Sequence, residues 1–311
     1  MSLIEQAAKR LEQLRQAGVE LPDEPVKPIT GSSETTISQP SPATAIDYSN
    51  SPRTHNPTTP GFVSAQTILD LDAISASGLL TPDAARSQLA DEFRVVKRPL
   101  IANAMGRGTT PVPNGNLIMV TSALPGEGKS FSAINLAISI AMELDNTVML
   151  VDADVARPSV LNMLGLPPAE GLLDVLEQNS VDISSVLLRT NIEKLSILPS
   201  GTPHPRATEL LASDTMIRLL DDMASRYSDR IIVFDSPPLL LTTEARVLAT
   251  HMGQIIIVVN AENTAQAAVK QAIATIESCP LKMMLLNQVR TSKTDGYGYG
   301  YGYGYGYGHE K

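Results

Sequence analysis

Residues 116–130 read "NLIMVTSALPGEGKS", and this stretch decides the fold. Its first part, 116–122, is apolar enough for a buried strand, and residues 129–144, after the glycines, have the spacing of a helix. A strand that leads through a glycine-rich loop into a helix is the setting that a phosphate-binding loop requires. The stretch therefore predicts an α/β protein with a phosphate site at the first turn of this helix.

The residues of this loop have the chemistry that phosphate binding needs. Gly126 and Gly128 allow backbone N–H groups to turn inward on the phosphates, and Lys129 can reach the β- and γ-phosphates of a nucleotide. The Ser130 hydroxyl can ligate Mg²⁺. Ala123 replaces the glycine that usually opens such a loop, and we expect the loop to tolerate this small change. The alternative is a chance glycine-rich turn. It does not account for the preceding strand, the Gly-Lys-Ser end of the loop and the following helix together.

Strand-like and helix-like segments alternate through the rest of the chain. Strands are predicted at 116–122, 147–154, 195–200, 230–236, 254–260 and 283–287, and helices at 129–144, 171–178, 206–226, 243–251 and 264–278. Several of the strand segments are apolar throughout, which is typical of parallel strands covered on both faces. The pattern predicts a doubly wound, mostly parallel sheet within about 85–290. Another helix is predicted just upstream of it, with an apolar face made of Leu89, Phe93, Val96, Leu100 and Ile101.

Three acidic residues lie at the C-terminal ends of two of the predicted strands. Asp235 ends the apolar segment "RIIVFDSPP", where an acid beside a phosphate loop binds the metal directly or through water. Asp152 and Asp154 end "TVMLVDADVARPS", with Arg157 shortly after them. Two carboxylates two residues apart point the same way from an extended segment, so one can bind metal while the other takes a proton from an incoming hydroxyl. Ordinary helix capping or turn chemistry is the alternative for this pair.

The two ends of the chain differ from its middle. Residues 296–308 read "GYGYGYGYGYGYG" and hold six of the eight tyrosines. Because alternating glycine cannot pack, we expect a disordered tail, either a sticky low-complexity segment or a row of accessible phenols. Residues 1–20 predict a short amphipathic helix that docks on its own chain or binds a partner, and 21–62 have the composition of a Pro/Ser/Thr-rich linker. The predicted organisation places the P-loop domain at 63–295 and the tail at 296–311.

Composition and charge narrow the functional classes. The formal net charge is −9, which argues against a protein that coats nucleic acid or anionic lipid. The single cysteine, Cys279, permits no internal disulfide and suits a reducing compartment. No apolar run approaches the roughly 18 residues of a membrane span, and the start has no hydrophobic signal region. We therefore expect a cytoplasmic, soluble protein whose membrane role, if it has one, passes through a partner.

The three motifs and the tail together resemble bacterial tyrosine kinases, which phosphorylate tyrosines clustered in their own C-terminal tails. "TSALPGEGKS", "VMLVDADVARPS" and "IIVFDSPP" are similar to the Walker A, Walker A′ and Walker B motifs of that family. The resemblance implies ATP and Mg²⁺ as cofactors, with Lys129, Asp152 and Asp154 as catalytic residues and Asp152 as the metal-linked base. The implied metal-site residues are Ser130, Asp152, Asp154 and Asp235. The implied nucleotide-binding residues are Pro125, Gly126, Glu127, Gly128, Lys129, Ser130, Phe131 and Asn287. The implied phosphorylation sites are Tyr297, Tyr299, Tyr301, Tyr303, Tyr305 and Tyr307.

The resemblance also implies partners and a location. "SQLADEFRVVKRPLIANA" is similar to the subgroup that acts with exosortase-linked exopolysaccharide export. In that subgroup a membrane protein that sets polysaccharide chain length activates the kinase, and here it would be a separate chain that recruits a cytoplasmic kinase to the inner membrane. The family's Glu-x-x-Arg-x-x-Arg interface motif, which supports a ring-like homo-oligomer of the unphosphorylated form, corresponds to Asp91, Arg94 and Lys97. Charge complementarity is kept at these positions, although lysine cannot form the two-pronged contacts of arginine.

Three functions stay open at this point. The first is an ATP- and Mg²⁺-dependent protein-tyrosine autokinase that regulates exopolysaccharide synthesis. The second is an ATPase switch of the partition or septum-positioning type, although those relatives carry an extra loop lysine where this chain has Leu124. The third is a non-catalytic regulator that only retains nucleotide. Asn287 is likewise open between pairing with an adenine edge and capping the end of a strand.

Overall fold

The computed structural model describes residues 65–178, 181–226 and 229–290. The chain divides into two units, Met1–Thr58 and Thr59–Lys311, and every described residue belongs to the second. The predicted N-terminal helix, the whole predicted linker at 21–62 and the tyrosine tail lie outside the described residues. Within the described residues, no helix is both long enough and apolar enough to cross a bilayer.

A seven-stranded sheet forms the centre of the described unit. Its strand order is β3-β4-β2-β5-β1-β6-β7, and every neighbouring pair is parallel except β3 with β4. The doubly wound, mostly parallel sheet predicted from the sequence is confirmed. The strands are β1 Leu117–Ser122, β2 Thr147–Asp152, β3 Leu188–Arg189, β4 Leu195–Leu198, β5 Arg230–Asp235, β6 Gln254–Asn260 and β7 Leu281–Asn287.

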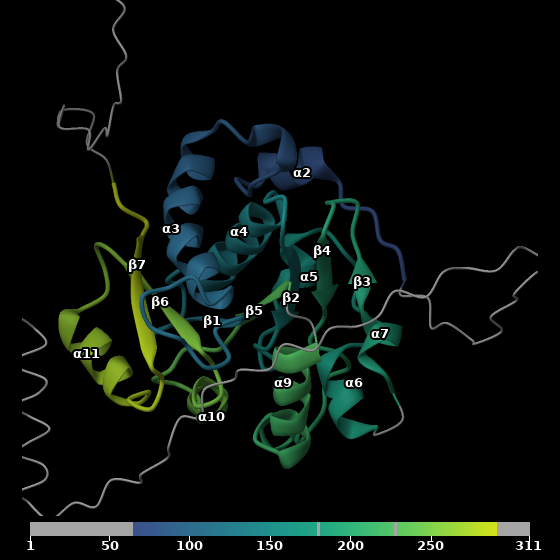
Figure 1. Cartoon of the computed structure of the whole chain (residues 1–311). Helices are drawn as coiled ribbons and strands as arrows, with labels where there is room; N and C mark the ends of the chain where they lie inside the picture. Colours follow the sequence, from purple (N-terminus) through teal and green to yellow (C-terminus); the bar gives the residue numbers. More distant parts are fainter. Residues whose placement is uncertain (1–64, 179–180, 227–228, 291–311) are drawn as a thin grey trace, which may run out of the picture. The chain divides into compact units, whose positions relative to one another are not determined.

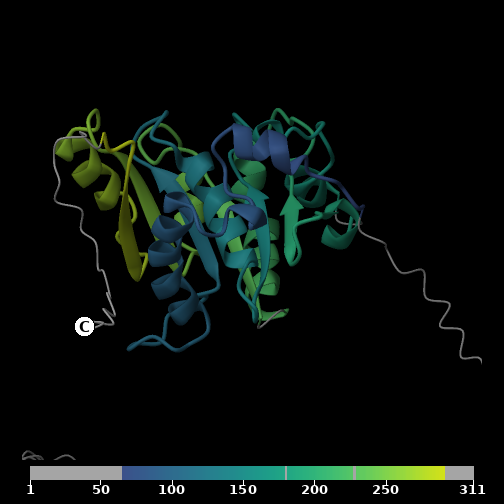
Figure 2. The ribbon, with the colours of Figure 1, turned by 90° about the horizontal axis from the view of Figure 1, so that it is seen from above.

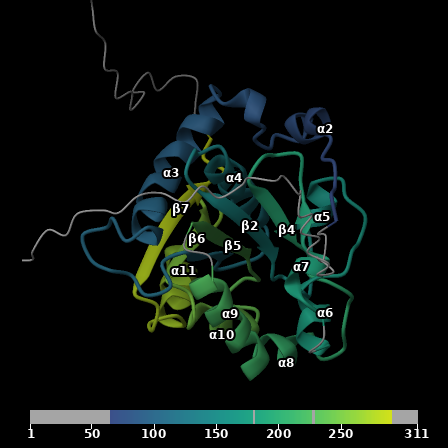
Figure 3. The same ribbon diagram turned by 45° about the vertical axis from the view of Figure 1, so that its right-hand side comes forward.

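Helices cover both faces of the sheet (Figures 1 and 3). One face carries α2 Leu71–Ala76, α3 Gln88–Ala104, α4 Lys129–Ala141 and α5 Val160–Met163. The other carries α6 Leu172–Glu177, α7 Ile183–Val186, α8 Ala207–Leu211, α9 Asp214–Arg226, α10 Glu244–Ala249 and α11 Gln266–Ala274. A short 3-10 turn, Pro82–Ala84, precedes α3. In Figure 2 the yellow strand β7 lies at one end of the sheet beside α11, far from the teal strands at the other end.

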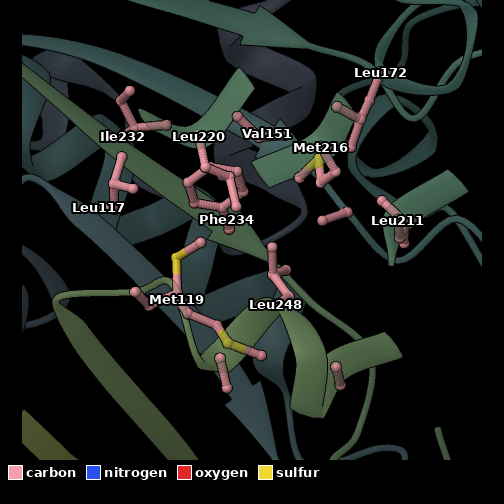
Figure 4. Close-up of a cluster of buried hydrophobic side chains, with 14 of the residues drawn as sticks. Leu117, Met119, Val151, Leu172, Leu211, Met216, Leu220, Ile232, Phe234 and Leu248 are labelled. Carbon is pink, nitrogen blue, oxygen red and sulfur yellow. The ribbon is translucent and has the colours of Figure 1, made fainter. Parts of the chain in front are cut away.

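Each central strand contributes to two separate cores. Leu117 and Met119 of β1 and Phe234 of β5 pack into the core under α9 and α10, which Figure 4 shows. Ile118 and Val120, the residues between them on β1, pack into the core under α3 and α4. Successive side chains of a strand point to opposite faces, so a strand covered on both faces must be apolar at every position. This requirement explains the unbroken apolar runs in the sequence.

Two predicted elements differ in the structure. The helix predicted at 206–226 is interrupted between α8 and α9, where the Ser213 hydroxyl donates to Leu210 O at 2.7 Å and accepts from Met216 N at 3.2 Å. A serine that bonds the neighbouring backbone competes with the helix ladder, so it ends one helix and caps the next. The strand predicted at 147–154 ends at Asp152, because the chain turns there toward α5.

Candidate nucleotide-binding site

The site lies where β1, β2 and β5 end, at the carboxyl edge of the sheet, the usual place for ligands in open α/β folds. In the pairing of β2 with β5, Asp152 stands directly opposite Asp235. In the pairing of β5 with β1, Asp235 stands opposite Val120, two residues before the end of β1. The topology therefore brings the two acidic strand ends and the glycine-rich loop together, as the sequence predicted.

The loop is shaped by glycines in the left-handed region. Gly126 has φ 80° and Gly128 has φ 90°, and both values are costly for any residue with a Cβ. Gly128 is also the N-cap of α4, and no side chain there occupies the first-turn N–H groups. These N–H groups and the positive end of the helix dipole are what a phosphate binds.

Glu127 supports the loop from inside the protein. Its side chain is only 2% exposed; one carboxylate oxygen accepts from Leu124 N at 2.6 Å, and the other accepts from Asn260 N at 3.4 Å and from the Thr264 hydroxyl. The carboxylate thus joins the start of the loop to the end of β6. Sequence reasoning placed Glu127 among nucleotide-binding residues but gave no signal for Asn260 or Thr264 as its partners.

Two amide side chains at the end of β7 fix the outer carbonyl groups of the loop. Asn287 donates from Nδ2 to Glu127 O at 2.9 Å, and Gln288 donates from Nε2 to Gly126 O at 3.2 Å. Because the C=O and N–H of a trans peptide point in opposite directions, these contacts turn the N–H groups of Glu127 and Gly128 the other way. Asn287 therefore holds the loop; its contact with an adenine edge stays a prediction. Gln288 was not predicted; its φ of 58° lies in the left-handed region.

Lys129 connects the loop to the acids. Its ammonium lies 2.6 Å from Asp154 Oδ2, 3.9 Å from Asp235 Oδ1 and 3.4 Å from Ser130 Oγ. Ser130 Oγ in turn accepts a hydrogen bond from Ser159 Oγ at 2.8 Å. The four predicted residues Lys129, Ser130, Asp154 and Asp235 are thus in one cluster, and a nucleotide phosphate would compete with Asp154 for the lysine.

The two acids at the end of β2 have different surroundings. Asp152 Oδ2 accepts from Ser159 N at 3.1 Å and Val160 N at 3.0 Å, so this carboxylate caps the start of α5. Burial, with the nearby Asp235 charge, raises the pKa of Asp152 to about 7. Asp154 Oδ1 accepts from Arg157 N at 3.2 Å, while its other oxygen pairs with Lys129. Capping and turn contacts, the alternative considered from the sequence, are therefore present together with the ion pair.

Asp235 is the acid whose surroundings fit a cation. It is 0% exposed, and within the described residues neither of its carboxylate oxygens accepts a hydrogen bond of good geometry, while the Ser130 hydroxyl and the Lys129 ammonium, 3.9 Å from Oδ1, lie nearby. Burial raises its pKa to about 6, and Lys129 and Ser130 partly oppose this shift. Burying a carboxylate without donors is costly, and Mg²⁺ prefers such oxygens together with hydroxyls like Ser130. Among the described residues no three His, Cys, Asp or Glu side chains are grouped so that they could hold a metal ion by themselves.

A cavity of about 370 Å³ opens beside the loop, and we call it the loop cavity. Its lining includes Lys129, Asp154 and the exposed Arg157. The segment after β5 contributes Pro237, Pro238, Leu241 and Thr242 to the lining. Pro125 and Gly126 also line it, whereas Asp152 lines a different cavity next to Pro158 and Ser200. Phe131 is half-buried and packs against the core under α3 and α4.

The predicted interface residues on α3 do not share one environment. Asp91 is exposed and Arg94 is half-buried; they form an ion pair with each other, and Arg94 also donates to Ala85 O at 3.0 Å. Lys97 is 5% exposed; its ammonium donates to Ser139 O at 2.5 Å and pairs with Glu143 Oε1 at 2.7 Å. Lys97 therefore joins α3 to α4, which leaves Asp91 and Arg94 as the residues available for an interface. The predicted tyrosine acceptors lie outside the described residues.

Comparisons with known proteins agree with this geometry. A protein-family model described as AAA domain matches residues 115–288, which span the loop, the three acids and all strands of the sheet. The tyrosine-protein kinase YwqD of Bacillus subtilis is 33% identical over 182 residues, which cover 58% of this chain and 75% of YwqD. The tyrosine-protein kinase CpsD of Streptococcus agalactiae is 29% identical over 180 residues, which cover 57% of this chain and 76% of CpsD.

Solved structures show the same relationship. The crystal structure of the chimerical protein CapA2B2 superposes with a TM-score of 0.56 at 26% identity, over 71% of this chain and 93% of that one. The family match covers more than half of this chain and includes every motif residue of the site. The chain belongs to the bacterial tyrosine-protein kinases, a family built on a P-loop nucleotide-binding fold.

Proposed function

We propose that the chain is an ATP- and Mg²⁺-dependent protein-tyrosine autokinase that phosphorylates its own glycine-tyrosine tail. The observation that carries the proposal is the cluster at the loop cavity, where Lys129 lies within 3.9 Å of Asp154 and Asp235. Such a lysine stabilises a transferring phosphoryl group, and the two acids supply a proton acceptor and a metal ligand. Family membership and the tyrosine-rich tail support tyrosine as the acceptor. The proposed phosphorylation sites are Tyr297, Tyr299, Tyr301, Tyr303, Tyr305 and Tyr307.

In the proposed reaction the phenol oxygen of a tail tyrosine attacks the γ-phosphorus of ATP. The bond from the γ-phosphorus to the β,γ-bridging oxygen breaks, and ADP leaves with that electron pair. A phenol with a pKa near 10 needs a proton acceptor at neutral pH. We assign this role to Asp154, because it lines the loop cavity and becomes free when Lys129 turns from it to the phosphates.

This assignment exchanges the two roles that the resemblance implied. Asp152 holds the Ser159 and Val160 amides and stands beside Asp235 in the sheet, so it belongs to the metal side of the site. Ser130, Asp152 and Asp235 are the residues that we expect to hold Mg²⁺. When bound, the ion would neutralise charge on the β- and γ-phosphates.

We further propose that the kinase works with a separate membrane protein that sets polysaccharide chain length and recruits it to the inner membrane. The net charge of −9 suits a basic cytoplasmic segment as the contact on that partner. The exposed Asp91 and the half-buried Arg94 support contacts between copies in a ring-like homo-oligomer, since an intrachain pair at a surface can exchange for an interchain one. These proposals rest on the resemblance and on charge.

The deciding experiment incubates the pure chain with γ-labelled ATP, Mg²⁺ and a membrane fraction. Label on tail tyrosines supports the kinase, whereas free phosphate alone would support an ATPase switch and neither would support a non-catalytic regulator. We expect Lys129→Met to lose at least about 100-fold in labelling rate, because the phosphoryl group loses its cation. The control is Lys270→Met, which removes an exposed lysine of α11 and should label as the wild type does. Undiminished labelling by the Lys129 variant would refute the loop assignment.

A further inference from the structure

The loop cavity is lined by two chemically different groups of residues. The charged group, Lys129, Asp154 and Arg157, belongs to the proposed site of phosphoryl transfer. Pro237, Pro238 and Leu241 carry no charge, and we call them the apolar wall. An apolar surface offers a phosphate group no favourable contact, so we expect a different chemical group to bind against this wall.

The backbone holds this wall in place before any ligand arrives. Leu239 N donates to Ser122 O at 2.9 Å, and Leu240 N donates to Ala123 O at 3.3 Å. The segment is therefore pinned to the end of β1 and to the first residue of the loop. A preformed wall costs little ordering entropy when a ligand binds.

Leu241 is displayed at the rim of the cavity. Its N–H donates to Pro238 O at 3.3 Å and closes a turn, yet the residue is 62% exposed. A single exposed leucine needs no explanation by itself. This one, however, lines the same cavity as Lys129 and Asp154, together with the largely buried Pro237 and Pro238. Apolar side chains of this kind are what an aromatic ring packs against.

We propose that Pro237, Pro238 and Leu241 form the binding site for the ring of the acceptor tyrosine, a side chain of the stretch 296–308. The ring would lie along the wall, with its hydroxyl directed to Lys129 and Asp154. The inference rests on the proposed function and names the substrate side of the same site. Glycine on both sides of each tyrosine leaves no neighbouring side chain to collide with the rim.

The length of the chain allows this occupant. Gln288 already contacts Gly126, and Gly126 lines the loop cavity. Tyr297 follows nine residues after Gln288, a stretch that spans up to about 30 Å when extended. A tail tyrosine can thus reach the cavity of its own chain, and one from a second copy meets the same wall.

The test measures transfer from ATP to the free peptide GYGYGYG by the full-length chain. Leu241→Ser should raise the KM for the peptide about tenfold, because the ring loses its main apolar contact. Leu241→Met, which conserves volume, should restore the wild-type KM. Leu144→Ser, at a leucine that is 86% exposed in a distant loop, is the matched control and should change nothing. Peptide binding with a non-hydrolysable ATP analogue is measured in parallel by calorimetry.

Each outcome decides the proposal. An unchanged peptide KM in Leu241→Ser, with normal transfer, would overturn the acceptor site and leave the kinase function standing. Weaker binding of the ATP analogue by this variant would assign the wall to the nucleotide, which also overturns the proposal. If the wild type transfers no label but binds the tyrosine peptide in a Leu241-dependent way, the acceptor site stands while the kinase function fails. A peptide with serine in place of tyrosine should neither bind nor accept label.

Discussion

Asp152 and Asp235 stand opposite each other in neighbouring strands, and both are buried. Burial is the main cause of their raised pKa values, about 7 for Asp152 and about 6 for Asp235; the charge of Asp235 adds to the first shift and the charge of Asp154 adds to the second. Selection for stability alone would not place them there. We interpret this local cost as the signature of a site that binds a cation, since a bound cation would remove it.

This arrangement makes stability depend on pH in a definite direction. The folded-state pKa values of both acids lie above the value of 3.8 for free aspartate, so between about pH 4 and pH 7 the folded state holds protons that the unfolded state has released. The free energy of unfolding of the metal-free chain should therefore fall as pH rises through this window. Urea denaturation at pH 5 and pH 7.5 measures the difference, and Asp235→Asn should reduce it. A wild-type chain that gains stability over this range would contradict the assignment.

At the scale of elements, periodicity and motif order account for most of the correct predictions from the sequence. The six longer strands were predicted because buried parallel strands are apolar at every position. The helix after the loop was predicted from the helical spacing of its apolar residues. The two-residue β3 and the four-residue α5 and α7 are too short to show a period, so they were missed. Among the site residues, the loop and the three acids carry motifs. Asn260, Thr264 and Gln288 act through single hydrogen bonds to the loop, and a hydrogen bond across the fold leaves no local pattern.

The loop and the ends of β6 and β7 therefore act as one unit. A substitution of Glu127, which connects the loop to β6, tests this interpretation. Glu127→Ala removes the acceptor for Leu124 N, Asn260 N and the Thr264 hydroxyl, of which the contact with Asn260 N is buried and the other two are partly buried. An unpaired buried donor costs about 1–3 kcal/mol, so ATP affinity should fall about 10- to 100-fold as the loop loses its shape. Calorimetric titration of an ATP analogue measures this. Glu277→Ala, at an exposed glutamate, is the control; equal affinities of the two variants would show that the loop keeps its shape without Glu127.

At the scale of the whole molecule, the tail changes the charge of the chain more than any other part can. Each phosphotyrosine adds about −1.5 to −2 charges at pH 7, so six add roughly −9 to −12 to a chain already at −9. These charges would be confined to the stretch 296–308. Screening limits their reach to about 8 Å at physiological salt, so repulsion acts mainly where several tails lie close together. An assembly that brings tails and active sites together is therefore weakened by the reaction that it promotes.

We accordingly expect phosphorylation to be transferred between copies, to slow as the tail fills, and to reduce the size of the assembly. The tail can reach its own cavity, so transfer between copies has to be shown directly. Lys129→Met with an intact tail is mixed with active chain whose six tail tyrosines are replaced by phenylalanine, and label on the inactive chain demonstrates transfer between them. Light scattering then compares the wild type before and after phosphorylation. If the wild type alone is labelled but the inactive chain in the mixture stays unlabelled, transfer takes place within one copy. Equal masses of the two phosphoforms would exclude the switch, because the added charge would then have no effect on assembly.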